Sequence, residues 1–348
     1  MPLETLELVR IIILGATAFV VAILLTPVLT HFLYKYKFSK QIKSERIAPV
    51  FNKYHRHKAG TPTMGGILIW GTAVFLLIVF YFLAIIFPES TLAKLNFLDR
   101  GETYLPIATL VIAALFGMAD DIFGVFKIGP RGGGLKMRDR IFLYTLVASL
   151  GALWFYFKLD WTTLSVPFLK EFNIGIWYIP YFIFVIVATA FSTNETDGLD
   201  GLSGGVLMVA YASFGIFAFL QGHYHLAGFV SVIMGALLAY LWFNIPPARF
   251  YMGDTGAMSL GITLGIIAML TDKSLLLPLV GFVLMVESSS VIIQMLSKKF
   301  RGKKIFRSTP IHHHFEALGW PESKIVMRFW IIAVVMAGFG IIIGIVGY

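Results

Sequence analysis

Runs of apolar residues, separated by short polar segments, dominate the sequence. A transmembrane helix needs roughly 20 apolar residues, and about ten runs reach or approach that length. The third and eighth runs are short, which suits helices that end on a recessed protein surface. The pattern predicts an all-α, polytopic integral membrane protein in which residues 1–348 form one domain. We expect the helices at residues 9–34, 66–87, 104–117, 141–158, 175–192, 202–220, 224–243, 256–271, 275–297 and 326–347.

Composition supports a membrane location. The chain is 58% hydrophobic and 14% charged, whereas soluble domains are about 25% charged. Its net charge of +9 is compatible with nucleic-acid binding. Basic cytoplasmic loops explain the same excess in a membrane protein, so we expect no nucleic-acid partner. Cysteine is absent, which excludes disulfides and thiolate chemistry.

The distribution of basic residues predicts the topology. Lys and Arg gather after the first, third and ninth helices, while the connections 88–102, 159–174, 221–223 and 272–274 contain few. Basic loops remain in the cytoplasm, so the odd-numbered connections should face the cytoplasm and both termini the periplasm. The first run exceeds the usual length of a signal-peptide core, and a basic segment follows it, so we predict a helix there.

Five polar clusters lie on odd-numbered connections and should therefore share one face of the membrane. The topology was inferred from Lys and Arg alone, so the placement of all five clusters on one face is partly independent evidence. It suggests that the clusters form one convergent site. The clusters are residues 58–66, Asp120-Asp121, residues 194–200, Asp254 and His312-His313-His314.

Asp120 and Asp121 close the third predicted helix. One interpretation is a pair of interfacial carboxylates that mark the helix end. Adjacent carboxylates repel, however, and a divalent cation removes that repulsion. Hard oxygen ligands suit Mg²⁺, which takes one or two carboxylates together with substrate phosphates. The pair alone leaves both interpretations open.

Asp254 precedes the eighth predicted helix, either as its N-cap or as a further metal ligand. Nearby Tyr251 has a ring that could stack on a nucleobase. Residues 194–202 read Asn-Glu-Thr-Asp-Gly-Leu-Asp-Gly-Leu and join the fifth and sixth helices. This segment is either a turn in which Asp200 caps the next helix, or a polar loop whose glycines let the backbone approach a ligand.

The run His312-His313-His314 could suggest zinc, but metal-binding His pairs are usually spaced about three to five residues apart. We therefore favour phosphate binding or substrate positioning. Glu287 lies inside the ninth apolar run with Gln294. A carboxylate there must face the helix bundle or a wet cavity, which makes it a functional candidate.

Together these segments resemble the phospho-N-acetylmuramoyl-pentapeptide transferases, a family of the polyprenyl-phosphate N-acetylhexosamine-1-phosphate transferase superfamily. The resemblance covers nearly the whole chain. The segment Pro-Ile-His-His-His-Phe-Glu at 310–316 looks specific to this branch. The other matching segments are residues 58–66, Asp120-Asp121, residues 194–202, residues 252–256 and residues 286–294.

The resemblance implies a bacterial inner (cytoplasmic) membrane enzyme that transfers phospho-MurNAc-pentapeptide from UDP-MurNAc-pentapeptide to undecaprenyl phosphate. The products are lipid I and UMP, Mg²⁺ is the cofactor, and the partners are these substrates and inner-membrane lipid. A homodimer is compatible with the sequence. The reaction is a displacement at the β-phosphorus, in which the protein positions reactants and neutralises charge. Asp120 would be a base for the lipid phosphate or a nucleophile in a two-step route.

The resemblance also assigns residues. Asp121 and Asp254 would hold Mg²⁺, and the catalytic positions are Asp120, Asp121, Asp254, His312, His313 and His314. The substrate-binding positions are Lys58, Thr63, Asn194, Asp197, Asp200, Tyr251, Gly253, Glu287 and Gln294. Three positions depart from the family pattern. Lys127 is the nearest substitute for a lysine after the Asp pair, Arg140 replaces a second lysine, and Tyr251 stands where phenylalanine is expected.

Two other functions are compatible with parts of the sequence. A transporter or channel would explain the helices and the intramembrane Glu287, but no repeated half or matched pair of broken helices is visible. A sister enzyme that uses UDP-GlcNAc would share the Asp pair. The His-run segment argues against that alternative.

Overall fold

The structure is a computed structural model that describes residues 2–39, 60–130, 133–169 and 171–348. Nearly all of its regular structure is helical. The long helices are α1 (Leu3–Lys35), α3 (Gly66–Ile86), α4 (Tyr104–Val125), α5 (Met137–Lys158), α6 (Tyr178–Thr196), α7 (Leu202–Leu220), α8 (Tyr224–Asn244), α9 (Gly253–Leu270), α11 (Phe282–Arg301) and α13 (Glu322–Val346). The short elements are η2 (Ala93–Leu95), η4 (Gly175–Trp177), η5 (Ser274–Leu276), α10 (Leu277–Val280), α12 (Ile311–Ala317) and the antiparallel strands β1 (Thr163–Leu164) and β2 (Phe172–Asn173).

The predicted all-α, polytopic membrane architecture is confirmed. Among the described residues, nine helices are long and apolar enough to cross a bilayer, and the number rises to ten if one bent pair counts as a span. Many of these helices expose large apolar side chains, as lipid-facing helices do.

Several predicted helix ends differ from the structure, and two of these differences bear on the site. The third helix continues past residue 117 to Val125, because Asp120 and Asp121 point to partners on other elements and do not end the helix. The eighth helix begins at Gly253, so Asp254 lies in its first turn.

The predicted ninth helix is broken. Residues 274–280 and 282–301 are inclined at 85° to each other. Pro278 lies in the first turn of α10, and Gly281 separates α10 from α11. Val280 packs on α13, against Gly340, whereas α11 leaves the bundle. One face of α11 is buried and mostly polar, and the other exposes apolar side chains. The break at Gly281 changes the direction of α11, so that its polar face packs on the protein and its apolar face points outward.

Helix α9 is the centre of the fold. Every residue from Gly253 to Met269 is buried, and α3, α4, α6 and α7 pack around it. Small residues permit this close packing, as is common between membrane helices. A Cβ atom at Gly261 would lie 2.8 Å from Cα of Ala190. At Gly117 on α4, an added Cβ would overlap the backbone carbonyl of Asp254. This last contact sets Asp120 and Asp121 beside the start of α9.

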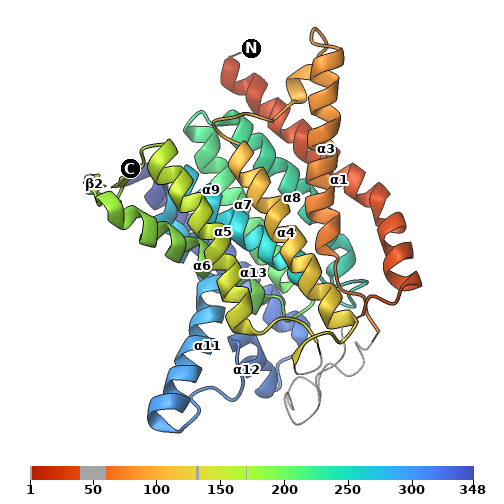
Figure 1. Cartoon of the computed structure of the whole chain (residues 1–348), viewed down its shortest axis with the longest axis vertical. Coiled ribbons are helices and arrows are strands. Elements are labelled where there is room, and N and C mark those ends of the chain that lie inside the picture. Colours follow the sequence, from red (N-terminus) through yellow and green to blue (C-terminus); the bar gives the residue numbers. More distant parts are fainter. Residues whose placement is uncertain (1, 40–59, 131–132, 170) are drawn as a thin grey trace.

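Figure 1 shows both termini at one end of the molecule and α12 at the other. The described polar clusters lie at the α12 end, where α4 finishes and α9 begins. At the opposite end, the backbone N–H of Phe168 donates to Gly347 O at 2.7 Å, which joins the β1–β2 hairpin region to the C-terminal residues. The structure therefore separates the two ends of the bundle, while their assignment to cytoplasm and periplasm stays a prediction.

The absence of cysteine makes this assignment easy to test, because a single introduced thiol has no background. Glu89 lies between α3 and η2, Lys304 lies between α11 and α12, and both are exposed. In intact cells, a membrane-impermeant maleimide should label Glu89→Cys and should label Lys304→Cys only after the membrane is opened. Labelling of Lys304→Cys in intact cells would overturn the topology.

Candidate active site

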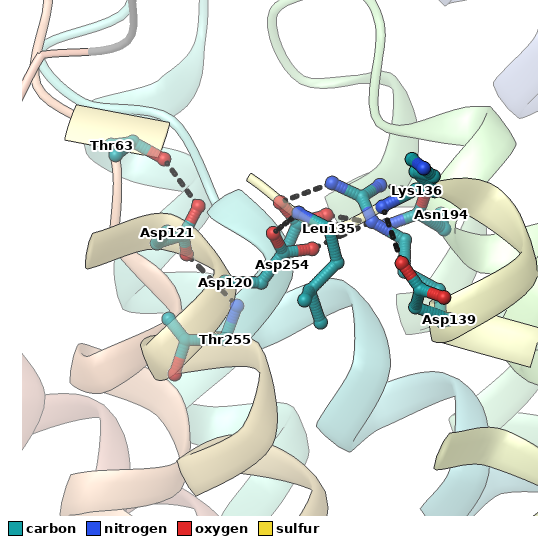
Figure 2. Close-up of polar contacts among 10 residues, drawn as sticks. Thr63, Asp120, Asp121, Leu135, Lys136, Asp139, Asn194, Asp254 and Thr255 are labelled. Carbon is teal, nitrogen blue, oxygen red and sulfur yellow. Dashed lines mark hydrogen bonds and ion pairs between the residues drawn. The ribbon is translucent and has the colours of Figure 1, made fainter. Parts of the chain in front are cut away.

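The two adjacent aspartates of α4 serve different parts of the site. Asp121 is fully buried, and its Oδ2 accepts the backbone N–H of Thr255 at 3.0 Å. Its Oδ1 accepts the hydroxyl of Thr63 at 3.3 Å. Figure 2 shows Asp121 between these partners, on the side of α4 that faces α3 and α9. Asp121 thereby joins the 60–66 segment to the first turn of α9.

Asp120 belongs to a second group of contacts, centred on Arg140 of α5. Its Oδ2 lies 2.6 Å from Nε of Arg140, and its Oδ1 accepts the backbone N–H of Leu135 at 2.6 Å. The same guanidinium reaches Oδ2 of Asp254 at 3.1 Å and Oδ1 of Asn194 at 3.1 Å. The planar fork of arginine suits this bridging of several oxygens, which the point charge of a lysine could not reproduce.

Asn194 completes the arrangement. Its Nδ2 donates to Oδ1 of Asp254 at 2.7 Å, so Arg140 and Asn194 together engage both oxygens of that carboxylate. Side chains from α4, α5, α6 and α9 thus converge at one point (Figure 2). Asp254 is not the N-cap of α9, because Met252 occupies that position and Asp254 lies in the first turn.

Three carboxylates gather at this site. Asp120, Asp121 and Asp254 are each at most 3% exposed, and Arg140 forms ion pairs with Asp120 and Asp254. Carboxylates that are brought together away from water repel one another, and a cation offsets that repulsion. The donors are hard oxygens, which fits Mg²⁺. Within the described ranges no group of three or more His, Cys, Asp or Glu is arranged to hold a metal, so phosphate oxygens would have to complete the coordination.

The 60–66 segment reaches the site by pairing with the segment before α9. Tyr251 N–H donates to Pro62 O at 2.8 Å, and Gly65 N–H donates to Tyr251 O at 2.7 Å. Gly253 has φ +74°, and a Cβ there would lie 2.6 Å from the Thr63 hydroxyl. Lys58 lies outside the described residues.

Tyr251 is half-buried beside this segment. Burial raises the pKa of the Tyr251 phenol to about 12, and a hydrogen bond with Thr61 only partly offsets that rise. The phenol therefore stays neutral at physiological pH, and its ring keeps an uncharged face that could stack on a base.

The segment 194–202 was predicted to be a connection between helices, but α6 continues to Thr196 and α7 begins at Leu202, so only residues 197–201 connect the two. We keep the name 194–202 loop for the whole segment, which several contacts hold. Asp197 accepts the hydroxyl of Ser203 at 2.8 Å, and Oδ2 of Asp200 accepts the N–H of Ala248 at 3.0 Å. The N–H of Asp200 donates to Glu322 at 2.7 Å. Asp200 does not cap α7, because Gly201 occupies the N-cap position with φ +81° and no side-chain bond.

The three histidines on α12 have three different partners, each through Nδ1. His312 is buried and contacts Glu287 at 2.9 Å. His313 contacts Glu316, one turn along the same helix, at 2.6 Å. His314 accepts the backbone N–H of Arg307 at 3.1 Å. The run is therefore not one cluster that points at one ligand.

Two predicted site residues lie apart from the carboxylates. Gln294 is buried and bonds to backbone groups of Ile305 and Phe306, so it shapes the connection that leads to α12. Lys127 is exposed at the end of α4. Sequence reasoning did not foresee the roles of the Leu135 N–H and of Glu322, since a backbone donor or a charge on the last helix carries no local signal.

Comparison with known proteins shows which family the chain belongs to. Residues 103–272 match the model of glycosyl transferase family 4, and residues 58–69 match phospho-N-acetylmuramoyl-pentapeptide-transferase signature 1. The chain is 37% identical to the phospho-N-acetylmuramoyl-pentapeptide-transferase of Clostridium novyi, over 93% of each protein. It is 33% identical to that of Chloroflexus aggregans, over 96% of this chain and 89% of the relative.

A polytopic helical bundle with a buried carboxylate site and these matches defines a membrane glycosyl-1-phosphate transferase. More narrowly, the chain belongs to the phospho-N-acetylmuramoyl-pentapeptide-transferase family, which makes lipid I in peptidoglycan biosynthesis.

The His312–Glu287 contact predicts a pH-dependent stability. Burial alone lowers the pKa of His312, but Glu287, followed by Glu316 and Glu195, raises it more, so the net pKa lies above its ordinary value. The ring of His313, centred 4.1 Å away, would oppose this only when protonated. A raised folded-state pKa stabilises the protein fully below the unfolded pKa of about 6.5, and this contribution disappears as pH rises through the folded pKa.

We therefore expect the thermal unfolding temperature in detergent to fall as pH rises above about 6.5, and Glu287→Gln to flatten this dependence because it removes the charge. The measurement is a series of unfolding curves between about pH 6 and 9 for both proteins. Parallel pH dependences in the two proteins would show that this pair does not control stability.

Proposed function

We propose that this site joins undecaprenyl phosphate to UDP-MurNAc-pentapeptide with the assistance of Mg²⁺, on the cytoplasmic face of the bacterial inner membrane. An oxygen of the lipid phosphate forms a bond to the β-phosphorus of the sugar nucleotide. The bond from that phosphorus to the bridging oxygen breaks, and UMP leaves with the oxygen. The products are undecaprenyl-diphospho-MurNAc-pentapeptide, which is lipid I, and UMP. A homodimeric state is part of the proposal.

The observation that carries this proposal is the convergence of buried carboxylates at one end of the bundle. Asp120 and Asp254 share the guanidinium of Arg140, and buried Asp121 is the neighbour of Asp120 on α4. A substrate diphosphate cannot approach three carboxylates without a compensating cation. Asp121 and Asp254 would hold Mg²⁺, and when bound the ion would neutralise charge on the diphosphate and on departing UMP.

Asp120 is our candidate to accept a proton from the lipid phosphate. A phosphate monoester has its second pKa near 6, so part of the lipid phosphate arrives protonated. The contacts from Arg140 and from the Leu135 N–H hold the Asp120 carboxylate in one orientation. The alternative is that Asp120 attacks phosphorus itself. A one-step route inverts configuration at phosphorus and a two-step route retains it, so a chiral phosphorothioate substrate separates the two.

The nucleotide would lie on the side formed by Tyr251 and the 194–202 loop. Tyr251 presents a neutral aromatic ring there. Asn194 links that loop to Asp254 at 2.7 Å, which would couple the nucleotide side to the phosphate side.

The direct test is UMP release by the purified protein in detergent, with undecaprenyl phosphate and either UDP-MurNAc-pentapeptide or UDP-GlcNAc. We expect release with the first sugar nucleotide and little with the second. Preference for UDP-GlcNAc would indicate the sister activity. Absence of UMP release with both substrates would contradict the proposal.

Asp254→Asn should reduce activity by at least about 10-fold, the usual scale for loss of a metal ligand or its orienting partner. Asp139→Asn is a matched control, because this carboxylate lies in the first turn of α5 at the same end of the molecule. We expect Mg²⁺ to raise the unfolding temperature of the control but not of Asp254→Asn. An Asp254→Asn enzyme with full rate and Mg²⁺ response would remove Asp254 from the metal site.

Tyr251→Ala should weaken the binding of UMP by about 1–3 kcal/mol, the scale of one lost base stack, whereas Tyr251→Phe should change it little. Calorimetry with UMP measures both variants without turnover. Equal losses in the two variants would mean that the hydroxyl and its contact with Thr61 matter, and that stacking does not.

A further inference from the structure

The contact between Glu287 and His312 connects two elements that otherwise diverge. Glu287 lies on α11, after the break at Gly281, and His312 lies in the first turn of α12. The two side chains are 0% and 1% exposed, and Oε2 of Glu287 lies 2.9 Å from Nδ1 of His312. Removing two ionisable groups from water costs desolvation free energy, which is offset only when their geometry is good. A purely structural contact could be made with less cost by apolar side chains.

The chemistry of this contact fixes the orientation of the ring. An ionised carboxylate only accepts hydrogen bonds, so Nδ1 of His312 carries a proton whether the ring is neutral or charged. The backbone N–H of His312 also approaches the same oxygen, at 3.5 Å. Nε2 is therefore turned to the opposite side. It is buried, and no described residue provides a hydrogen-bond partner for it.

Gly198 of the 194–202 loop lies against that opposite edge of the ring. A Cβ atom at Gly198 would overlap Nε2 of His312 and would lie 2.7 Å from its Cε1. A flexible side chain could move aside, but Glu287 holds this ring through Nδ1 and its surroundings enclose it. The backbone of the loop therefore rests on the ring. Asp197 precedes Gly198 directly, and Asp200 follows shortly after.

We propose that Glu287 is a positioning residue for the transfer reaction. Its carboxylate orients His312, the far edge of the ring supports Gly198, and this support sets the position from which the 194–202 loop meets the sugar nucleotide. Glu287 and His312 then act on substrate through the loop and do not touch the reacting atoms. The inference rests on the proposed function, because it assumes that this loop binds the nucleotide side.

The neighbouring histidines distinguish this role from a general one. His313 pairs with Glu316 of its own helix, and His314 accepts a bond from the backbone of Arg307. The three heavy atoms nearest to a Cβ at Gly198 all belong to the ring of His312.

The first experiment compares Glu287→Gln with Glu287→Ala. The glutamine carbonyl can still accept the Nδ1–H, so Glu287→Gln should keep both KM values within about 3-fold. Glu287→Ala should raise KM for UDP-MurNAc-pentapeptide by about 10-fold or more, as loss of an orienting partner does, with little change in KM for undecaprenyl phosphate. Ser290→Ala is the matched control, since its hydroxyl is buried on α11 and donates to the backbone carbonyl of Glu287 in the same helix. Equal changes in both KM values, or none, would overturn the proposal.

The second experiment does not depend on the stability of Glu287→Ala. Asn at position 312 can donate to Glu287 through its amide but lacks the far edge of the ring. In the parent protein, Gly198→Ala should lower kcat/KM by about 10-fold, because the added methyl group collides with the ring of His312. In His312→Asn that edge of the ring is gone, so Gly198→Ala should lower kcat/KM by less than about 3-fold. The two effects are then non-additive. Additive losses would show that the ring does not support the loop.

These outcomes separate the two proposals. If the parent protein fails to release UMP, the proposed function is wrong. If it releases UMP but the two substitutions add independently, only the positioning role is wrong. The same four proteins also form a double-mutant cycle in unfolding temperature, which tests the contact between the ring and Gly198 without any substrate.

Discussion

The placement of three carboxylates in a nearly water-free region is the constraint on which the site depends. Asp120 and Asp254 share one guanidinium, and Asp121 is satisfied by a backbone N–H and a hydroxyl. Each compensating group comes from a different element, so the charges can be buried only when α4, α5, α6 and α9 are assembled. The carboxylate site and the tertiary structure of this end of the bundle therefore form together.

Much of the architecture could be predicted from the sequence. In a chain that is 58% hydrophobic, long apolar runs indicate helices, and acidic residues at their ends are conspicuous. Asp120, Asp121, Asn194 and Asp254 were expected to converge. The structure places Asp120, Asn194 and Asp254 around Arg140, whereas Asp121 contacts Thr63 and the first turn of α9. The positive-inside pattern identifies which connections lie together, which is why residues far apart in sequence could be assigned to one face.

The details that escaped prediction depend on tertiary contacts. The break at Gly281 follows from the packing of α10 on α13, and no hydropathy profile contains that information. Leu135 donates to Asp120 through its backbone N–H, which every residue except proline has. The side chain at position 135 therefore does not reveal this donor. The pairing of Glu287 with His312 joins residues on two elements whose relative position is set by a bend that the sequence does not reveal.

The glycine at position 117 has an evolutionary consequence. It contributes no functional atom, yet its missing side chain lets α4 approach the backbone of Asp254. Interiors are packed so densely that even a methyl group there would force the two helices apart. Natural selection is therefore expected to disfavour any larger residue at this position. Lipid-facing side chains are under no such packing constraint, whereas this seam between α4 and α9 requires a residue without a side chain.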